Sequence, residues 1–420
     1  MQYFLFAFYF LVFCWLIVRI RFFRNAGIQN SWLIALFICK IIGGVAIGWV
    51  SLHLYDPAND YWNTNRDALS EYHLLYTNPK EYFANFFHSG YPDKYGGFFD
   101  SSNSFWNDLK NNLVIKLVSV FNIFTGGNYY VNSLFFNFVI FFGHVALFRI
   151  FTSVYKNGQP LILIGCFLLP STLYFTSGIH KDGLVFLIIA LIAYILFRLF
   201  QGGQRVPISL VGILLLVVFL FLLRNYVLFA LLPALLAWGL AERIKKSSLI
   251  IFATVYLISG ILFFNLHYLN NKLDPAALVA KRQAEFMVMQ TGKTTIVLDS
   301  LRPSFNSYVS NFPQAADHAF LRPYLFEMPS AYLIPLNFEL LIYLILFLLF
   351  LFFRKKNKSS IPAVVFFGIA LSISLFLLIG YIVPNLGAIV RYRSLFWPFL
   401  ITPILMGIDW KRFSRPLSST

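Results

Sequence analysis

Two aspartates, Asp56 and Asp60, stand directly beyond a long apolar stretch, in the sequence LYDPANDYW. A carboxylate held at a membrane surface can act as a general base and remove a proton from an acceptor hydroxyl group. Asp, Asn and Pro are also turn formers, so a purely structural turn is the alternative interpretation. Because the pair Asp56-Pro57 is the more typical turn sequence, we favour Asp60 over Asp56 as the catalytic base.

His180, Lys181 and Asp182 are consecutive in the sequence SGIHKDG, which joins two apolar stretches. The connection is too short to lift three ionisable side chains far into water, and charges at this depth are costly and often functional. Asp182 by itself is explained as the cap of the following helix, where a carboxylate complements the helix dipole. That structural explanation leaves His180 and Lys181 unaccounted for. We therefore predict a site in which Asp182 is catalytic and His180 and Lys181 bind substrate.

Arginines stand at two further places on the same expected side of the membrane: Arg224, between two apolar stretches, and the pair Arg391 and Arg393, just before the last stretch. A guanidinium group binds phosphate in a bidentate manner, so all three are predicted to bind substrate. An arginine that simply reaches the lipid headgroups is the alternative. We expect this last segment to be partly extended, because Pro384 ends the preceding helix and Gly387 loosens the residues after it. An extended chain would place both arginines on one face.

Common motifs for other chemistries are absent from the sequence, which contains no glycine-rich nucleotide-binding loop and no HExxH, GxSxG or CxxC pattern. It therefore gives no support for a metalloprotease, a serine hydrolase or a redox enzyme. The three cysteines, Cys14, Cys39 and Cys166, lie inside apolar stretches without metal-ligand spacing and are predicted to be packing residues. No cofactor is identified, and a divalent cation held by Asp182 is left open.

The stretches between these residues have the length and composition of membrane-spanning helices. Of the 420 residues, 59% are hydrophobic and only 12% are charged, against about 25% in a typical soluble domain. A helix needs about 20 apolar residues to cross the hydrocarbon core. We therefore predict an all-α, polytopic transmembrane helical bundle with about eleven spans, at residues 3–19, 32–53, 128–150, 160–176, 183–200, 207–223, 225–240, 249–266, 331–353, 361–382 and 394–408.

Basic residues predict how this bundle is oriented. They gather in alternate connections, which contain only two acids, Glu242 and Asp409. Because cytoplasmic connections are enriched in Lys and Arg, the N-terminus is predicted to lie outside and the C-terminus inside. The same rule explains the formal charge of +16 without nucleic acid as a partner. The basic clusters are Arg19, Arg21 and Arg24; Arg149 and Lys156; Arg198 and Arg205; Arg243, Lys245 and Lys246; Arg354, Lys355, Lys356 and Lys358; and Lys411, Arg412 and Arg415.

Two long connections, 54–127 and 267–330, fall on the predicted outer side, and long ordered loops usually carry function. In the first, Lys116, Ser119 and Asn122 recur at three-residue spacing among apolar residues, which predicts an amphipathic helix lying on the membrane. We divide the chain into an additional N-terminal span with its cytoplasmic loop, a transmembrane module, the second outer loop, and the C-terminal spans with a cytoplasmic tail: residues 1–31, 32–266, 267–330 and 331–420.

The layout resembles the GT-C superfamily of glycosyltransferases, which are polytopic and use polyprenyl-phosphate-linked sugar donors. In that family a long first outer loop bears surface-lying helices and a catalytic acid just beyond a span, which matches the acidic, aromatic-rich sequence DPANDYW. A second acid often stands at the start of the fourth span of the family's module, and Asp182 occupies that place. The second large loop of the family follows the seventh span of the module. Residues 267–330 have this position when 3–19 is taken as an additional helix.

The resemblance implies a membrane glycosyltransferase that moves a sugar from a polyprenyl-phosphate-linked donor to an acceptor on the outer face, in surface glycan or glycolipid synthesis. Its partners would be that donor and membrane lipids. We expect a multi-pass protein of a bacterial inner membrane, with the long loops periplasmic or extracellular. The alternatives are a polysaccharide repeat-unit polymerase or ligase that relies on arginines, a transporter or flippase of lipid-linked sugar, and a non-catalytic assembly factor. Transporters often have ionisable residues near the bilayer midplane, and here the candidates are few, Lys40 and Glu339.

Overall fold

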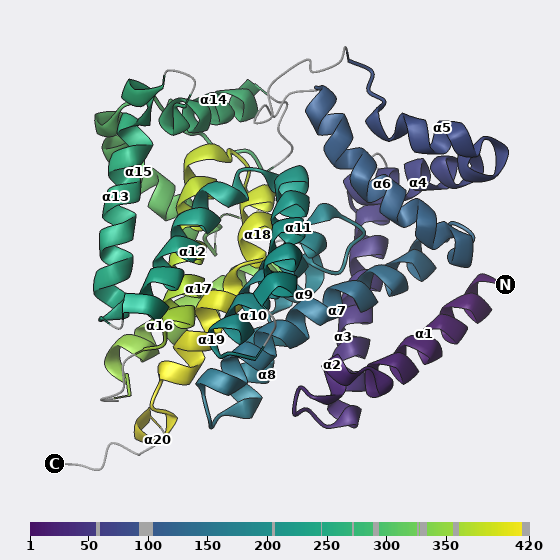
Figure 1. The fold of residues 1–420 in the computed structure, drawn as a ribbon, viewed down its shortest axis with the longest axis horizontal. Coiled ribbons are helices and arrows are strands. Elements are labelled where there is room, and N and C mark those ends of the chain that lie inside the picture. The colour runs from purple at the N-terminus through teal and green to yellow at the C-terminus, as the bar shows by residue number, and fades with distance from the viewer. Residues whose placement is uncertain are drawn as a thin grey trace. The chain divides into compact units, whose positions relative to one another are not determined.

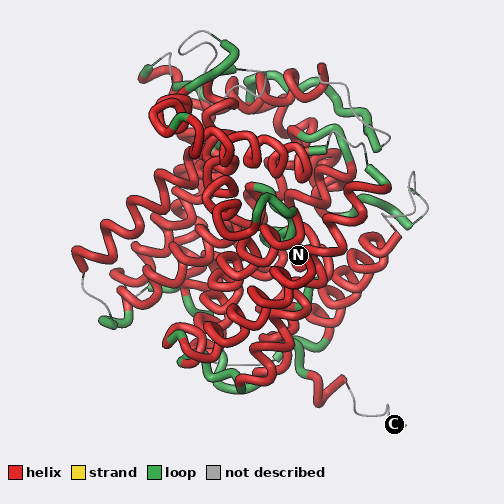
Figure 2. The backbone as a smooth tube through the Cα atoms, turned by 90° about the vertical axis from the view of Figure 1, so that its right-hand side faces the viewer, coloured by secondary structure: helices red, strands yellow, loops and turns green. Residues whose placement is uncertain are grey.

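The fold is described by a computed structural model, which covers residues 1–55, 59–91, 104–203, 206–244, 246–270, 273–288, 294–325, 327, 334–355 and 361–413. It is 82% helix, and the described residues form no strand (Figure 2). Nine helices within these ranges are long and apolar enough to cross a membrane, as expected for an integral membrane protein (Figure 1). They are α1 (Gln2–Arg19), α3 (Asn30–His53), α7 (Tyr129–Val154), α10 (Lys181–Phe200), α11 (Val206–Arg224), α12 (Val227–Ile244), α13 (Ser248–Leu269), α16 (Ile334–Phe352) and α17 (Ala363–Ile382).

The other two predicted spans are present as shorter helices. The stretch 160–176 forms α8 (Gln159–Phe167) and α9 (Pro170–Phe175), with a break at the intervening residues. Pro170 begins the second helix because proline lacks the N–H group that would continue the first one. The stretch 394–408 contains α19 (Trp397–Gly407), which is preceded by α18 (Leu386–Ser394).

Two compact units make up the chain, and each is described by itself. The first contains residues 1–150 and 172–228, and the second contains residues 151–171 and 229–420. In the first unit, α3 approaches α7 closely at two glycines. A Cβ atom on Gly44 would lie 2.5 Å from Asn137 Nδ2, and a Cβ atom on Gly48 would lie 2.5 Å from the Tyr129 ring. Small residues at this spacing allow two helices in a membrane to pack backbone to backbone.

The described part of the first long loop folds into a lobe of helices, in which the helix around Lys116 turns polar side chains inward. Lys116 Nζ lies 2.5 Å from Glu71 Oε2, and Ser119 Oγ lies 2.8 Å from the hydroxyl of Tyr82. Asn122 is fully buried as well. The predicted helix around these residues is therefore present, and its polar face packs against the rest of the lobe. The helices are α4 (Asp60–Thr77), α5 (Pro79–Ala84), η1 (Asn85–Phe87) and α6 (Phe105–Thr125).

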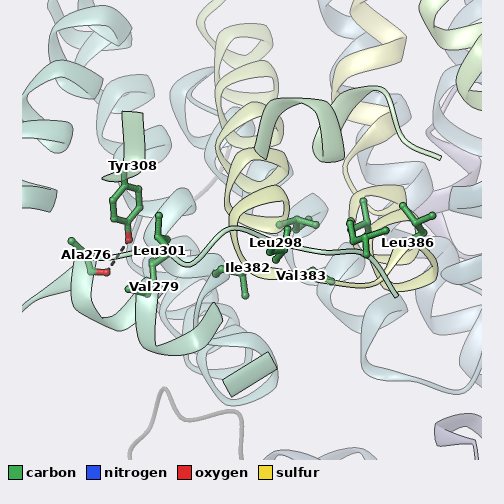
Figure 3. Packing of buried hydrophobic residues seen from close by; sticks show 12 residues of the cluster. Ala276, Val279, Leu298, Leu301, Tyr308, Ile382, Val383 and Leu386 are labelled. Carbon is green, nitrogen blue, oxygen red and sulfur yellow. Dashed lines mark hydrogen bonds between the residues drawn. The ribbon is translucent and has the colours of Figure 1, made fainter. Parts of the chain in front are cut away.

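In the second unit, the second long loop forms two helices, α14 (Pro275–Val288) and α15 (Phe305–Phe320), over a buried apolar cluster. Figure 3 shows the segment with Leu298 and Leu301 passing close to the end of α17. Tyr308 in α15 donates a hydrogen bond to the carbonyl of Ala276 in α14 at 2.8 Å. The hydroxyl of Tyr381, in α17, donates to the carbonyl of Tyr308 at 2.7 Å. These bonds fix both loop helices to the end of one span.

Candidate active site in the first unit

Asp60 begins α4, and the end of α3 holds this helix start in place. The side chain of Asn59 caps α4 by accepting hydrogen bonds from the N–H groups of Tyr61 and Trp62, at 3.1 and 3.2 Å. Its amide nitrogen donates to the Ser51 carbonyl at 2.8 Å. The indole of Trp62 donates to the carbonyl of Gly48 at 3.0 Å. The first turn of α4, and Asp60 with it, is therefore attached directly to a membrane-spanning helix.

The turn that carries His180 is held by two membrane-spanning helices. Lys40 in α3 donates hydrogen bonds to the hydroxyls of Thr176 and Ser177, at 2.6 and 3.0 Å, and is almost completely buried. Asn137 in α7 donates to the carbonyl of Ser177 at 3.0 Å. Both partners of Lys40 stand just before the charged sequence, so the backbone that positions His180 is fixed by both helices.

Tyr61, the residue after Asp60, packs onto the same turn. A Cβ atom at Gly178 would lie 2.5 Å from the Tyr61 ring, so only glycine allows this approach. The ring of Tyr61 lies with its centre 5.6 Å from the centre of the His180 imidazole. The close packing brings the start of α4 against the start of α10, two elements that are far apart in the sequence.

His180 lies between two carboxylates. Its Nε2 atom is 3.6 Å from Asp60 Oδ2, and its Nδ1 atom is 3.0 Å from Asp182 Oδ2. The first distance is an ion-pair contact, longer than a hydrogen bond, whereas the second is a hydrogen bond. A carboxylate oxygen only accepts, so the contact with Asp182 assigns the proton to Nδ1 and leaves Nε2 facing Asp60. The longer contact of Nδ1 with the N–H group of Asp182, at 3.4 Å, is not a hydrogen bond in this tautomer.

Arg224 completes the chain of charges behind Asp182. Its Nη2 atom binds Asp182 Oδ1, and its Nη1 atom donates to the hydroxyl of Tyr226. The Asp182 side chain has no exposed surface, and that of Arg224 is 6% exposed. A buried carboxylate of this kind needs a paired cation, because an isolated charge would be strongly destabilising. In this structure Arg224 therefore neutralises Asp182.

Exposure of the side chains to solvent falls steeply along this row. Asp60 is 68% exposed, His180 is 7% exposed, and Asp182 is fully buried. The open end of the row is therefore a carboxylate that an incoming molecule can reach, and the closed end is a neutralised ion pair. The imidazole nitrogen Nε2 of His180 lies 3.6 Å from this exposed carboxylate. This geometry suits a general base supported by an oriented histidine.

Four of the residues predicted from sequence, Asp60, His180, Asp182 and Arg224, thus come together in one row. Lys181 is half-buried and is the first residue of α10. Asp56 lies outside the described residues. Sequence reasoning did not assign site roles to Tyr61 and Tyr226, although each stands within two residues of a predicted site residue. Their aromatic type beside a charged residue was the available signal.

Arg391 and Arg393 belong to the second unit, and the expectation of an extended segment around them is wrong. Both lie in α18, which begins directly after Asn385. The side chain of Asn385 caps that helix by accepting from the N–H group of Ala388 at 3.0 Å, which overcomes the effect of Pro384. Two residues apart on a helix point about 200° apart, so the two arginines do not share a face.

Arg393 is buried within the second unit, with 2% of its surface exposed. Its Nη1 atom donates to the carbonyl of Ala319 at 3.0 Å, and its guanidinium lies 5.7 Å from the centre of a Trp397 ring. Arg391 is half-buried. Burial and these contacts give Arg393 a structural environment, whereas Arg391 keeps part of its surface open.

Metal binding was left open by the sequence. Among the residues that the structure describes, no group of three or more His, Cys, Asp or Glu side chains has an arrangement that could hold a metal ion. Comparison with known proteins adds no further information on the site: no family model, curated protein or solved structure matches the chain. Function is therefore inferred from the geometry of these side chains.

Proposed function

We propose that the protein is a membrane glycosyltransferase that transfers a sugar from a polyprenyl-phosphate-linked donor to a hydroxyl acceptor on the outer face of the membrane. The observation that supports this proposal most is the row Asp60, His180 and Asp182, which has an exposed carboxylate at one end and a buried, neutralised carboxylate at the other. The proposal includes the topology of about eleven spans in a bacterial inner membrane, with residues 54–127 and 267–330 outside and Lys355 inside.

In the proposed reaction, Asp60 accepts the proton of the acceptor hydroxyl while that oxygen attacks the anomeric carbon of the donor sugar. The new bond joins the acceptor oxygen to the anomeric carbon. The bond between that carbon and the phosphate oxygen breaks, and its electron pair leaves with the polyprenyl phosphate. The proton on Asp60 can then pass to Nε2 of His180. The carboxylate of Asp182 orients the imidazole and stabilises the imidazolium that forms.

The developing negative charge on the leaving phosphate requires a cation. Arg224 is engaged with Asp182 and Tyr226, so its contribution to the site is indirect. In the first unit, Lys181, one residue from His180, is our candidate for the phosphate. In the second unit, the half-buried Arg391 is a candidate on the basis of its residue type. Arg393 is a weaker candidate than Arg391 because its guanidinium is buried against a backbone carbonyl.

The test compares Asp60→Asn with Asp67→Asn in cells that depend on the protein for a surface glycan. Asp67 is an exposed carboxylate on the same helix, seven residues further along, and provides a matched control. Asp60→Asn should reduce transfer of labelled sugar by about 100-fold or more, since general bases contribute about 10²–10⁴-fold. The lipid-linked donor should accumulate, while expression stays unchanged. Wild-type transfer in Asp60→Asn would exclude Asp60 as the base.

The same experiment separates the alternative functions. If the protein is a polymerase, Asp60→Asn should leave single repeat units on the acceptor in place of long chains. If it is a flippase, Asp60→Asn should leave the lipid-linked sugar in the inner leaflet, where added glycosidases cannot reach it. Lys40 and Glu339, the two residues expected near the bilayer midplane, give no specific support to the alternative function as a transporter. Lys40 is bonded to two hydroxyls, and the carboxylate of Glu339 accepts from the N–H and hydroxyl groups of Ser171, each at 3.0 Å.

A further inference from the structure

The second unit contains an apolar groove between two membrane-spanning helices and the second outer loop. It has a volume of about 480 Å³, which is within the range of about 300–1,000 Å³ for pockets that hold small ligands. Its walls are formed by α13, α15 and α17, with one residue from α14. Aromatic and aliphatic side chains make up most of the lining, among them Phe264, Phe312 and Leu378.

The polar groups along this groove are already used by the protein itself. The hydroxyls of Tyr308 and Tyr381 donate to the backbone carbonyls of Ala276 and Tyr308. The hydroxyl of Ser374 donates to the carbonyl of Ala370 at 2.7 Å. None of the lining residues is charged. The surface offered to a ligand is therefore hydrocarbon and aromatic ring, which binds an apolar chain and offers nothing to a phosphate group or a sugar.

The groove lies at the level where the apolar zone of a membrane ends. Phe263 and Phe264 are in the last two turns of α13, and Leu377, Leu378 and Tyr381 are in the last two turns of α17. The roof is α15, which is too polar to be a span and carries a stripe of exposed apolar side chains. These are Phe305, Val309 and Phe312, with exposures of 62%, 53% and 47%, at helical spacing along one face.

The surface of α13 leads from this groove directly to lipid. Four of its large apolar side chains, Leu257, Ile258, Ile261 and Leu262, are between 45% and 67% exposed. In a membrane-spanning helix such side chains contact the hydrocarbon of the bilayer. The groove is thus continuous with the lipid-facing surface, and a chain can enter it without passing through water.

We infer that this groove binds the upper part of an acyl chain of a bilayer phospholipid and so joins the second outer loop to the membrane. An acyl chain is the most abundant hydrocarbon beside α13. A polyprenyl carrier would be selected through its phosphate, and the lining residues include no cation that would do this. This inference is independent of the glycosyltransferase proposal. It concerns the second unit alone.

The experiment uses the full chain in phosphatidylcholine vesicles that contain a small fraction of phosphatidylcholine with a diazirine near the carboxyl end of one acyl chain. After irradiation and proteolysis, mass spectrometry locates the lipid adducts. We expect adducts on α15 at Phe312, as well as on Phe264 and Leu378. Adducts restricted to the outward face of α13, with none on α15, would overturn the inference.

Two variants test the groove itself. Leu378→Trp fills the space with a larger side chain and should reduce the adducts on Phe312 several-fold, whereas the same change at the exposed Leu257 should leave them unchanged. Phe312→Asp places a carboxylate at the groove, which would have to lose its hydration against the chain, and should reduce the adducts on Phe264 and Leu378; its exposed position makes loss of folding a lesser concern. Unchanged labelling in both groove variants would contradict the site. Loss of labelling on adding an excess of a polyprenol, but not of unlabelled phosphatidylcholine, would show that the occupant is an isoprenoid and would overturn the assignment to an acyl chain.

Discussion

The Nδ1 atom of His180 lies 3.0 Å from Oδ2 of Asp182, and the other oxygen of this buried carboxylate binds Arg224. Asp182 is thus shared between an imidazole and a guanidinium. These two side-chain partners are additional to the place of Asp182 in the first turn of α10, where a carboxylate also complements the helix dipole. Because one carboxylate serves both partners, the stability of the buried pair and the orientation of the imidazole depend on the same residue.

Breaking the buried pair should destabilise the protein strongly. Asp182→Asn leaves the guanidinium of Arg224 buried without a countercharge, and Arg224→Met does the same to the carboxylate. Each should lower the free energy of unfolding by about 3–5 kcal/mol, whereas the double variant should lose less than the sum. Thermal unfolding in detergent measures this. The more exposed pair Lys281 and Glu285 is the control, because Glu285→Gln should cost less than about 1 kcal/mol. Additive losses at Asp182 and Arg224 would argue against the pair.

His180 should be needed for turnover more than for stability. His180→Gln keeps a hydrogen-bonding side chain of similar size but cannot carry the proton received from Asp60. We expect transfer of labelled sugar to fall by about 10²–10⁴-fold, with a melting temperature within a few degrees of the wild type. A variant that transfers sugar normally would place the proton acceptor elsewhere.

Lys40 should act on the site through the turn that it holds. Lys40→Met removes both hydrogen bonds, to Thr176 and Ser177, and keeps a long apolar side chain in a buried position. Transfer should fall about tenfold, and adding Ser177→Ala to Lys40→Met should cost little more, because the two changes remove one shared interaction. Ile42→Met on the exposed side of α3 is the control. Fully additive effects would mean that Lys40 and Ser177 act separately.

The two arginines of α18 should respond differently to lysine. Arg393→Lys removes the guanidinium that donates a hydrogen bond to the Ala319 carbonyl and contacts Trp397. We therefore expect it to cost about 1–3 kcal/mol of stability and to leave the KM for the lipid-linked sugar unchanged. Arg391→Lys should keep the stability and raise the KM for the lipid-linked donor several-fold, because lysine lacks the planar fork that binds phosphate. Equal KM values in the wild type and Arg391→Lys would remove Arg391 from the phosphate site.

His318 should make the second long loop, residues 267–330, sensitive to acid. Burial lowers the pKa of His318 from the usual value of about 6.5, and the guanidinium of Arg322, 2.9 Å away, lowers it further. The folded protein therefore binds fewer protons here than the unfolded chain does. Stability should fall as the pH drops below about 6.5 and level off below the folded pKa. Unfolding measured between pH 7 and pH 5 should show this slope, and His318→Gln should lack it. An equal slope in both proteins would assign the effect to other groups.

Prediction from the sequence was most accurate for features that depend on a single helix or a single turn. Apolar length located the nine long apolar helices of the described residues, and the charged turn before α10 was identified from the contiguity of His180 with Lys181 and Asp182. The row of side chains also needed residues that the sequence separates by more than a hundred positions, and Tyr61 on Gly178 is what brings Asp60 to the turn. Pairing of this kind depends on tertiary packing, which single-sequence patterns do not contain.

The failures have local physical causes. At Arg391 and Arg393, the effect of Pro384 was overestimated, because Asn385 supplies a cap that starts a new helix immediately after the proline. The direction of the amphipathic helix in the first loop could not be predicted from its pattern. Spacing identifies a polar face, but whether that face meets water or other polar groups depends on partners such as Glu71 and Tyr82.

Both halves of the proposed site are attached to α3. The carbonyls of Gly48 and Ser51, near its C-terminal end, hold the start of α4 with Asp60, and Lys40, at least two turns earlier in the helix, holds the turn with His180. A change in bilayer thickness makes membrane-spanning helices tilt. Because both anchoring points belong to one helix, we expect a tilt of α3 to move the carboxylate and the imidazole together. The geometry of the proposed site should therefore change little with bilayer thickness.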